Sequence, residues 1–342
     1  MTIRHFRPED ATEVISLWNT ALRDDKRHSQ WYIQESLLSQ ERLHRIVTNA
    51  NFDSRGTFVV HDNGQLIGFG RCVVKTVQTY KDEELVNLPG YCEGLVVKTS
   101  FRRRGIGSQI LQAIESHLMA EGKADIQIGF YHSGINGLSI LPDTPEYAFL
   151  FKHNFRPESR EMKLQLDITG FILGDDIIRR RDQLKSDGID IRYYEREDET
   201  AFCTFMDSEF QRWWRLNYRP NIERDTPLPV LIAVHEHKVI GFIGFVALGD
   251  NRRANFNPGI GVDVRYRNRG IGKVLVSVWI NEVKAMGAEE CLISTGINNY
   301  PAQRVYCDRG FKTLEKFAAL SKARTLRAQS KHSSRAPAEG RY

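Results

Sequence analysis

The sequence has no long apolar run, little cysteine and no leader-like N-terminus. No stretch of 18 apolar residues occurs among its 342 residues, so no membrane span is expected. The first six residues, 1–6, read as a strand without an apolar core or a small-residue cleavage site, which predicts a cytoplasmic protein. The five cysteines are widely spaced and form no CxxC or Cys/His metal pattern. We therefore expect reduced cysteines and no bound metal.

The net charge of +5 is concentrated at the C-terminus. Residues 321–342 contain six basic residues and one acid, so the preceding chain is close to neutral. This composition predicts a basic, disordered tail, and contact of the tail with RNA is the minor alternative. For the folded body we expect no nucleic-acid partner and no membrane partner.

A glycine-rich pattern, Arg-x-x-Gly-x-Gly, occurs twice, at 102–107 and at 267–272. Each copy follows an apolar strand-like run and precedes a helical pattern, so its backbone N–H groups and the helix N-terminus would form an anion cradle. A Walker loop is excluded because Val274 follows Gly272-Lys273, where such a loop needs Ser or Thr. The dinucleotide fingerprint is excluded because Ile110 and Leu275 stand where its third glycine would be.

The repeat extends well beyond the glycine pattern. Residues 3–12 match 191–200 in register, and each half continues with a predicted hairpin, the first around Asp62-Asn63-Gly64. The pattern predicts a mixed α/β fold with helices on both faces of a mixed sheet, present twice. We predict an N-terminal domain at 1–167, a linker with a short helix at 168–190, a C-terminal domain at 191–320 and the tail at 321–342.

The repeated pattern resembles the pyrophosphate loop of the GNAT acyltransferase superfamily, which binds acyl-coenzyme A. The duplication resembles two-domain members of that superfamily, with mycothiol synthase as one such tandem arrangement. The resemblance implies that acetyl-CoA is the co-substrate. The residues that it places around acetyl-CoA are Val97, Arg102, Arg104, Gly105, Gly107 and Ser108 in the first half, and Val262, Val264, Arg267, Arg269, Gly270, Gly272, Lys273 and Asn299 in the second.

The same resemblance implies a general acid in the second half, and Tyr147 is the candidate substitute in the first half. Tyr306 stands where the superfamily has the tyrosine that protonates the coenzyme A thiolate, whereas the first half has Leu150 at that register and Tyr147 one turn earlier. Glu93 is a candidate general base in the first domain, because family members often place a glutamate on this strand. The second half has Pro258 at the same register, so a water relay to Asp263, His235 or another carboxylate is the alternative there.

These residues predict an acyl-CoA-dependent N-acyltransferase with an active second domain and a catalytically degenerate first domain. The leading hypothesis is direct transfer of an acetyl group to the primary amine of a small molecule within a ternary complex. The alternatives are a peptide or protein N-acetyltransferase and a non-catalytic acyl-CoA sensor. Trp213, Trp214 and Tyr218 would form either an aromatic wall for the acceptor or part of the core. The sequence makes no prediction about oligomeric state.

Overall fold

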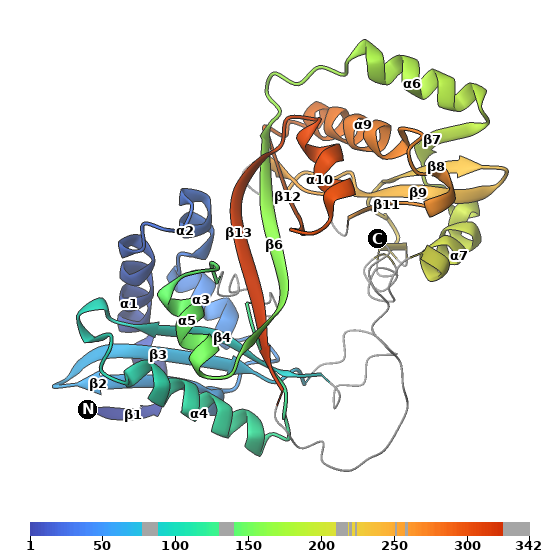
Figure 1. Ribbon diagram of the computed structural model, residues 1–342. Coiled ribbons are helices and arrows are strands. Elements are labelled where there is room, and N and C mark those ends of the chain that lie inside the picture. Colours follow the sequence, from blue (N-terminus) through green and yellow to red (C-terminus); the bar gives the residue numbers. More distant parts are fainter. Residues whose placement is uncertain are drawn as a thin grey trace. The chain divides into compact units, whose positions relative to one another are not determined.

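The computed structural model describes residues 1–76, 88–129, 140–209, 218, 221–222, 224–249, 252–256 and 259–323 (Figure 1). It divides into two compact units, of which unit 1 is Met1–Glu161 with Glu315–Tyr342 and unit 2 is Met162–Leu314. The units are therefore not consecutive in sequence, unlike the predicted ranges 1–167 and 191–320. The chain passes between them within two long strands, β6 (Arg156–Asp167) and β13 (Lys312–Lys322).

Unit 1 is a mixed sheet covered by helices. Its strand order is β1-β2-β3-β4-β5-β13-β6, in which β4 pairs parallel to β5 and β5 pairs antiparallel to β13. Apolar residues of α4 recur at helical spacing and are buried against this sheet, as the sequence predicts. The elements are β1 (Thr2–His5), α1 (Ala11–Asp24), α2 (Gln30–Ser36), α3 (Gln40–Val47), β2 (Thr57–Asp62), β3 (Gln65–Val73), β4 (Gly90–Val97), α4 (Ile106–Ala120), β5 (Ile126–Ile128) and α5 (Pro145–Lys152).

Strand β13 completes unit 1, although it closes the second half of the sequence. Leu320 lies opposite Ile128 of β5, and the Lys322 ammonium binds the Glu115 carboxylate of α4 at 2.7 Å. A bridge between Ile140 and Ala318 adds a second attachment. The C-terminal strand is thus built into the sheet that carries the first glycine loop.

Unit 2 repeats the arrangement with its strands divided between two sheets. One sheet has the order β11-β9-β8-β7, and the other contains β6-β12-β10. Helix α9 belongs to the hydrophobic core of unit 2, where its Trp279 and Leu275 side chains are fully buried. The elements are α6 (Asp175–Ser186), β7 (Ile189–Tyr193), α7 (Glu199–Glu209), β8 (Val230–His235), β9 (Lys238–Phe245), β10 (Arg253–Ala254), β11 (Ile260–Val262), α9 (Ile271–Ala285), β12 (Glu290–Gly296) and α10 (Tyr300–Cys307).

The duplication is preserved at the level of single ion pairs. In unit 1 the Arg4 guanidinium binds both carboxylate oxygens of Asp10, at 2.7 and 2.6 Å. In unit 2 Arg192 binds Asp198 in the same way, at 2.7 and 2.8 Å. Each aspartate also accepts a backbone N–H three residues upstream, which fixes the turn after the first strand. The predicted register between 3–12 and 191–200 therefore holds in three dimensions.

Some sequence predictions fall outside the described residues. These are Pro258, Trp213, Trp214 and most of the predicted tail, which begins at 321. Among the described residues, no helix combines the length and the apolar character that a membrane crossing needs. Tyr218 is described and lies in the core, where it packs edge-on against Phe202 and Phe242. Tyr218 is therefore a packing residue and not part of an acceptor wall.

Candidate functional site

Both glycine loops adopt the same backbone path between a strand and a helix. In unit 1 a short 3₁₀ turn follows β4, Arg103 and Gly105 take left-handed φ values of 65° and 81°, and α4 begins at Ile106. In unit 2 Asn268 and Gly270 take φ values of 62° and 77° before α9 begins at Ile271. Left-handed residues at these points turn successive N–H groups toward one side of the loop.

The arginines of each loop are held by the loop itself. The Nε of Arg102 donates to the Val97 carbonyl at 3.1 Å, and Arg267 donates to the Val262 carbonyl at the same distance. Arg104 and Arg269 lie over the rings of Phe101 and Tyr266, at 5.0 and 5.2 Å from the centroids. These printed contacts use a carbonyl or a ring, so the guanidinium groups keep further N–H donors for an anion beside the loop.

Each loop therefore has the geometry of an anion-binding cradle, and we call the loops cradle 1 (102–107) and cradle 2 (267–272). The first N–H groups of α4 and α9 have no intrahelical acceptor, and the helix dipole makes this end electropositive. Together with the arginines, this arrangement suits a pyrophosphate group, whose oxygens accept hydrogen bonds from backbone N–H and guanidinium groups alike.

The two cradles have matching walls. A Cβ added at Gly107 would lie 3.5 Å from the Phe149 ring of α5, and a Cβ at Gly272 would lie 4.0 Å from Val305 of α10. Helices α5 and α10 thus lie against corresponding points of their cradles, with Phe149 and Val305 in equivalent positions. The next residues, Leu150 and Tyr306, are therefore equivalent, as the sequence register predicts.

The two walls differ in their chemistry. Tyr306 is 3% exposed and packs against the rings of Phe256 and Phe311, at 5.6 and 5.9 Å. Burial raises the pKa of its hydroxyl well above the ordinary value, so the group stays protonated at neutral pH. Leu150 is equally buried but has no proton to donate. Tyr147, the substitute considered in unit 1, has its hydroxyl 3.3 Å from Nη2 of Arg160.

Among the described residues, the strand beside each cradle has an edge without a pairing partner along part of its length. In unit 2 β11 is the terminal strand of its sheet and pairs with β9. In unit 1 the described pairing of β4 with β5 covers Gly90 to Cys92, the first three residues of β4. An unpaired strand edge presents backbone N–H and C=O groups, to which an extended amide-containing chain can bind. Val262 is the last residue of β11, and Val97 is the last residue of β4, the corresponding strand of unit 1. Val264 lies beyond the edge, in the 3₁₀ turn that follows β11.

Glu93, the candidate base of the first domain, lies in a buried ion pair. Its carboxylate is 3.0 Å from the Arg71 guanidinium, and both side chains are 1% exposed. A base must reach the amine that it deprotonates, whereas this carboxylate is enclosed and neutralised by a cation. The geometry favours a structural role for Glu93.

Several other predicted residues bind neighbours within their own unit. The Asp263 carboxylate accepts hydrogen bonds from the backbone and the guanidinium of Arg265, which lower its pKa and make it a weak base. His235 Nδ1 lies 3.0 Å from the Tyr266 hydroxyl. The Asn299 side chain caps α10 by accepting from the Ala302 N–H.

Two residues at the helix starts also have partners. The Ser108 hydroxyl lies 3.0 Å from His153 Nε2 in unit 1. In unit 2 the Lys273 ammonium binds Asp176 of α6 at 2.8 Å. Cradle 2 is therefore bordered by a helix that the sequence assigns to the linker.

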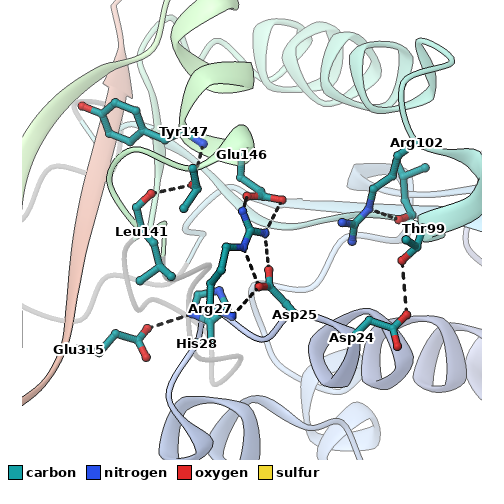
Figure 2. A network of polar contacts seen from close by, with 12 residues as sticks. Asp24, Asp25, Arg27, His28, Thr99, Arg102, Leu141, Glu146, Tyr147 and Glu315 are labelled. Atoms are coloured by element: carbon teal, nitrogen blue, oxygen red, sulfur yellow. Dashed lines mark hydrogen bonds and ion pairs between the residues drawn. The ribbon is translucent and has the colours of Figure 1, made fainter.

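Sequence reasoning did not identify a polar network in unit 1 (Figure 2). Arg27 follows α1 and binds Asp25 at 2.6 Å and Glu146 of α5 at 2.8 Å. His28 Nδ1 lies 3.0 Å from the Glu315 carboxylate of β13, which also accepts from the hydroxyl and N–H of Ser29. Glu146 and Glu315 are far in sequence from the segment 25–29 that they bind, and the contacts follow no motif, so only the fold brings them together.

The Glu315 contacts predict a pH-dependent contribution to stability. Burial opposes ionisation of Glu315, but the hydrogen bonds from His28 and Ser29 outweigh it and lower the pKa of this carboxyl. A lowered pKa stabilises the fold above the unfolded-state value and loses this contribution as the pH falls through the folded-state value. We expect Glu315→Gln to lower the free energy of unfolding by about 1–3 kcal/mol at pH 7.

Urea unfolding of wild type and Glu315→Gln between pH 3 and pH 7 measures this effect. The difference between the two proteins should shrink as the pH falls below the unfolded-state pKa of 4.5. A difference that stays constant across this range would show that the charge of Glu315 is not what holds β13.

Comparison of the sequence with known proteins identifies one family, and comparison of the structure identifies one shared fold. The sequence model described as "Acetyltransferase (GNAT) family" matches residues 15–132 and 191–311, so each cradle lies inside a matched region. No curated protein matches the sequence.

Solved structures resemble the chain over nearly its whole length. One is a GCN5-related glucosamine N-acetyltransferase region of a fungal multi-domain GH3 β-N-acetylglucosaminidase, with a TM-score of 0.68 and 17% identity. The alignment covers 94% of this chain but only 38% of that protein chain. A GCN5-related N-acetyltransferase from Sphaerobacter thermophilus has a TM-score of 0.60 and 17% identity, with 94% and 95% covered. A tandem GNAT protein from the clavulanic acid biosynthesis pathway has a TM-score of 0.56 and 14% identity, with 94% and 97% covered. At these identities the likeness establishes the shared fold alone.

Proposed function

The chain belongs to the acetyltransferase (GNAT) family, and from this premise we propose that it transfers an acetyl group from acetyl-CoA directly to the primary amine of a small molecule, with unit 2 as the catalytic unit. The observation that carries the proposal is the register of α10: Val305 lies against Gly272 of cradle 2, and Tyr306, the next residue, offers a phenol where unit 1 has Leu150.

The fit to acetyl-CoA rests on the chemistry of cradle 2 and its neighbouring strand. Backbone N–H groups at the start of α9, together with Arg267 and Arg269, suit the pyrophosphate. The open edge of β11 suits the amide groups of the pantetheine arm, which would direct the thioester toward α10. Binding both reactants in one site supplies much of the rate by proximity.

The proposed reaction needs one proton donor from the protein. The amine nitrogen attacks the thioester carbonyl carbon, the C–N bond forms, and the C–S bond breaks. The departing thiolate takes the proton of the Tyr306 hydroxyl. The nitrogen releases its proton to water, and a proton from water restores the Tyr306 phenol before the next turnover. Asp263 is a weak acceptor for that proton because Arg265 already holds its carboxylate.

Unit 1 has a different part in this proposal. Its cradle retains the geometry for a pyrophosphate, but its wall contains Leu150, and Glu93 is enclosed with Arg71. We assign to unit 1 a structural or acceptor-shaping role. This assignment allows cradle 1 to bind acetyl-CoA without transferring its acetyl group.

The test is release of coenzyme A thiol from acetyl-CoA in the presence of a panel of amines. Glucosamine comes first, because the fungal structure is named a glucosamine N-acetyltransferase region; other amino sugars, polyamines and short peptides follow. The proposal predicts thiol release that depends on one class of small amine and matches the amount of acetylated product by mass spectrometry. Transfer confined to peptide N-termini would favour the protein-acetylating alternative, and acetyl-CoA binding without any transfer would favour a sensor.

A further inference from the structure

The two cradles differ at one cationic position. Cradle 1 contains three consecutive arginines, Arg102, Arg103 and Arg104, whereas cradle 2 has Asn268 in place of the middle one. Arg103 and Asn268 share the same left-handed backbone, with φ values of 65° and 62°. The second cradle therefore keeps the path of the loop but lacks one of its three guanidinium groups.

A guanidinium from outside the loop lies over cradle 2. Arg180 belongs to α6, and its Nε donates to the Arg269 carbonyl at 2.8 Å, with a second bond from Nη2 to the same oxygen. A Cβ built on Gly270 would be 3.0 Å from Arg180 Nε and 3.4 Å from its Cγ, so the side chain lies directly against the turn. Around Gly105 of cradle 1, by contrast, a Cβ would meet no described atom within 4 Å.

The charges around Arg180 leave its cation available to an anion. Among the residues that the structure describes, its hydrogen bonds go to a carbonyl and not to a carboxylate. Asp176 of α6 is bound to the Lys273 ammonium at 2.8 Å. A guanidinium has five N–H donors in a planar fork, so Arg180 can keep its carbonyl contact and still donate to a phosphate oxygen.

We propose that Arg180 of α6 binds the pyrophosphate of coenzyme A in cradle 2, in place of the arginine that this loop lacks at Asn268. The inference rests on the proposed function, because it assumes that cradle 2 holds coenzyme A. It gives α6 a binding role that the sequence, which indicates a linker with a solvated charged face, does not suggest. Coenzyme A affinity of unit 2 then depends on a helix that belongs to this unit but precedes the repeated sequence, which begins at 191.

The experiment is calorimetric titration of coenzyme A into the full chain with Gly107→Glu present, so that cradle 1 carries a repelling carboxylate. In this background Arg180→Ala should raise the dissociation constant for coenzyme A about tenfold, the lower end for a charge-assisted hydrogen bond at an exposed site. The ratio of the two dissociation constants, variant to background, should become smaller at high salt, because salt screens the attraction between the guanidinium and the phosphates. Dephospho-coenzyme A, which keeps the pyrophosphate, should show the same loss, and pantetheine, which lacks it, should show none.

Two further variants make the test specific. Arg179→Ala removes the neighbouring exposed arginine of the same helix and should leave the dissociation constant unchanged. Asn268→Arg, added to Arg180→Ala, should restore most of the lost affinity, because Arg103 shows that an arginine fits this backbone.

The outcomes separate the inference from the proposed function. Coenzyme A binding that Arg180→Ala leaves unchanged would overturn the inference alone. Tighter binding would also overturn it and would identify α6 as a cover that competes with the ligand. Absence of coenzyme A binding in the wild-type chain would overturn both.

Discussion

Replacing Tyr306 by Phe is expected to lower kcat for acetyl transfer by at least about 100-fold, the usual contribution of a positioned general acid. The thiolate would then leave without a proton donor, whereas the phenyl ring keeps the packing against Phe256 and Phe311. Because only a hydroxyl is removed from a buried ring, the dissociation constant for acetyl-CoA and the unfolding free energy should change little. Steady-state kinetics, calorimetric titration and thermal unfolding of the same preparation measure the three quantities.

The matched control is Tyr147→Phe, which removes the hydroxyl beside the equivalent wall in unit 1. It should leave kcat near the wild-type value if unit 2 alone performs transfer. A wild-type kcat in Tyr306→Phe, or a large loss of kcat in Tyr147→Phe, would contradict the assignment of the general acid to unit 2.

Glu93→Gln is expected to lower the free energy of unfolding by about 3 kcal/mol, because it leaves the buried Arg71 cation without its carboxylate. Breaking a buried pair is costly, since the remaining charge loses the carboxylate that offset its desolvation. Urea unfolding at pH 7 measures the change. The kcat of the folded fraction should stay close to that of the wild type, because the pair lies in unit 1.

The double variant Arg71→Met/Glu93→Leu tests whether the loss comes from the unpaired charge. Removing both charges and keeping the volume should recover most of the stability lost in Glu93→Gln. A Glu93→Gln protein of unchanged stability but strongly reduced kcat would instead identify Glu93 as the general base.

The sequence predicts the cradles well because their geometry is local. Glycine at a left-handed position, a strand before it and an apolar helical pattern after it specify the loop, and both copies adopt it with nearly the same φ values. The correspondence between α5 and α10, which places Leu150 where Tyr306 stands, is also predicted, because it follows from the same local repeat. Asn154 takes φ 68° where Gly310 takes 91°, so an asparagine replaces the glycine without altering the turn.

The features that the sequence does not predict are those that depend on distant packing. The repeat predicts a closing strand for the second half, but nothing in the sequence specifies that this strand, β13, pairs with β5 of unit 1. The contact between Glu315 and His28 depends on this pairing. Likewise, the arginines of α6 read as a solvated face, and only the folded chain shows that Arg180 lies on Gly270. Glu93 matches a family position, yet its burial with Arg71 follows from the neighbouring strand.

The central claim is that acetyl-CoA for catalysis binds in cradle 2, and charge placed in each cradle tests it most directly. Gly272 and Gly107 suit this design because neither has a positive φ and a Cβ at either would meet only ordinary contacts of 3.5 Å or more. Acetyl-CoA is titrated into Gly272→Glu and Gly107→Glu, with Gly272→Gln and Gly107→Gln as uncharged controls of the same size, and turnover is measured in parallel. The account predicts that Gly272→Glu loses both turnover and the binding of one acetyl-CoA molecule. Both losses should be much larger than those in Gly272→Gln. Gly107→Glu should lose far less turnover than Gly272→Glu. Wild-type binding and turnover in Gly272→Glu, or loss of turnover in Gly107→Glu alone, would contradict it.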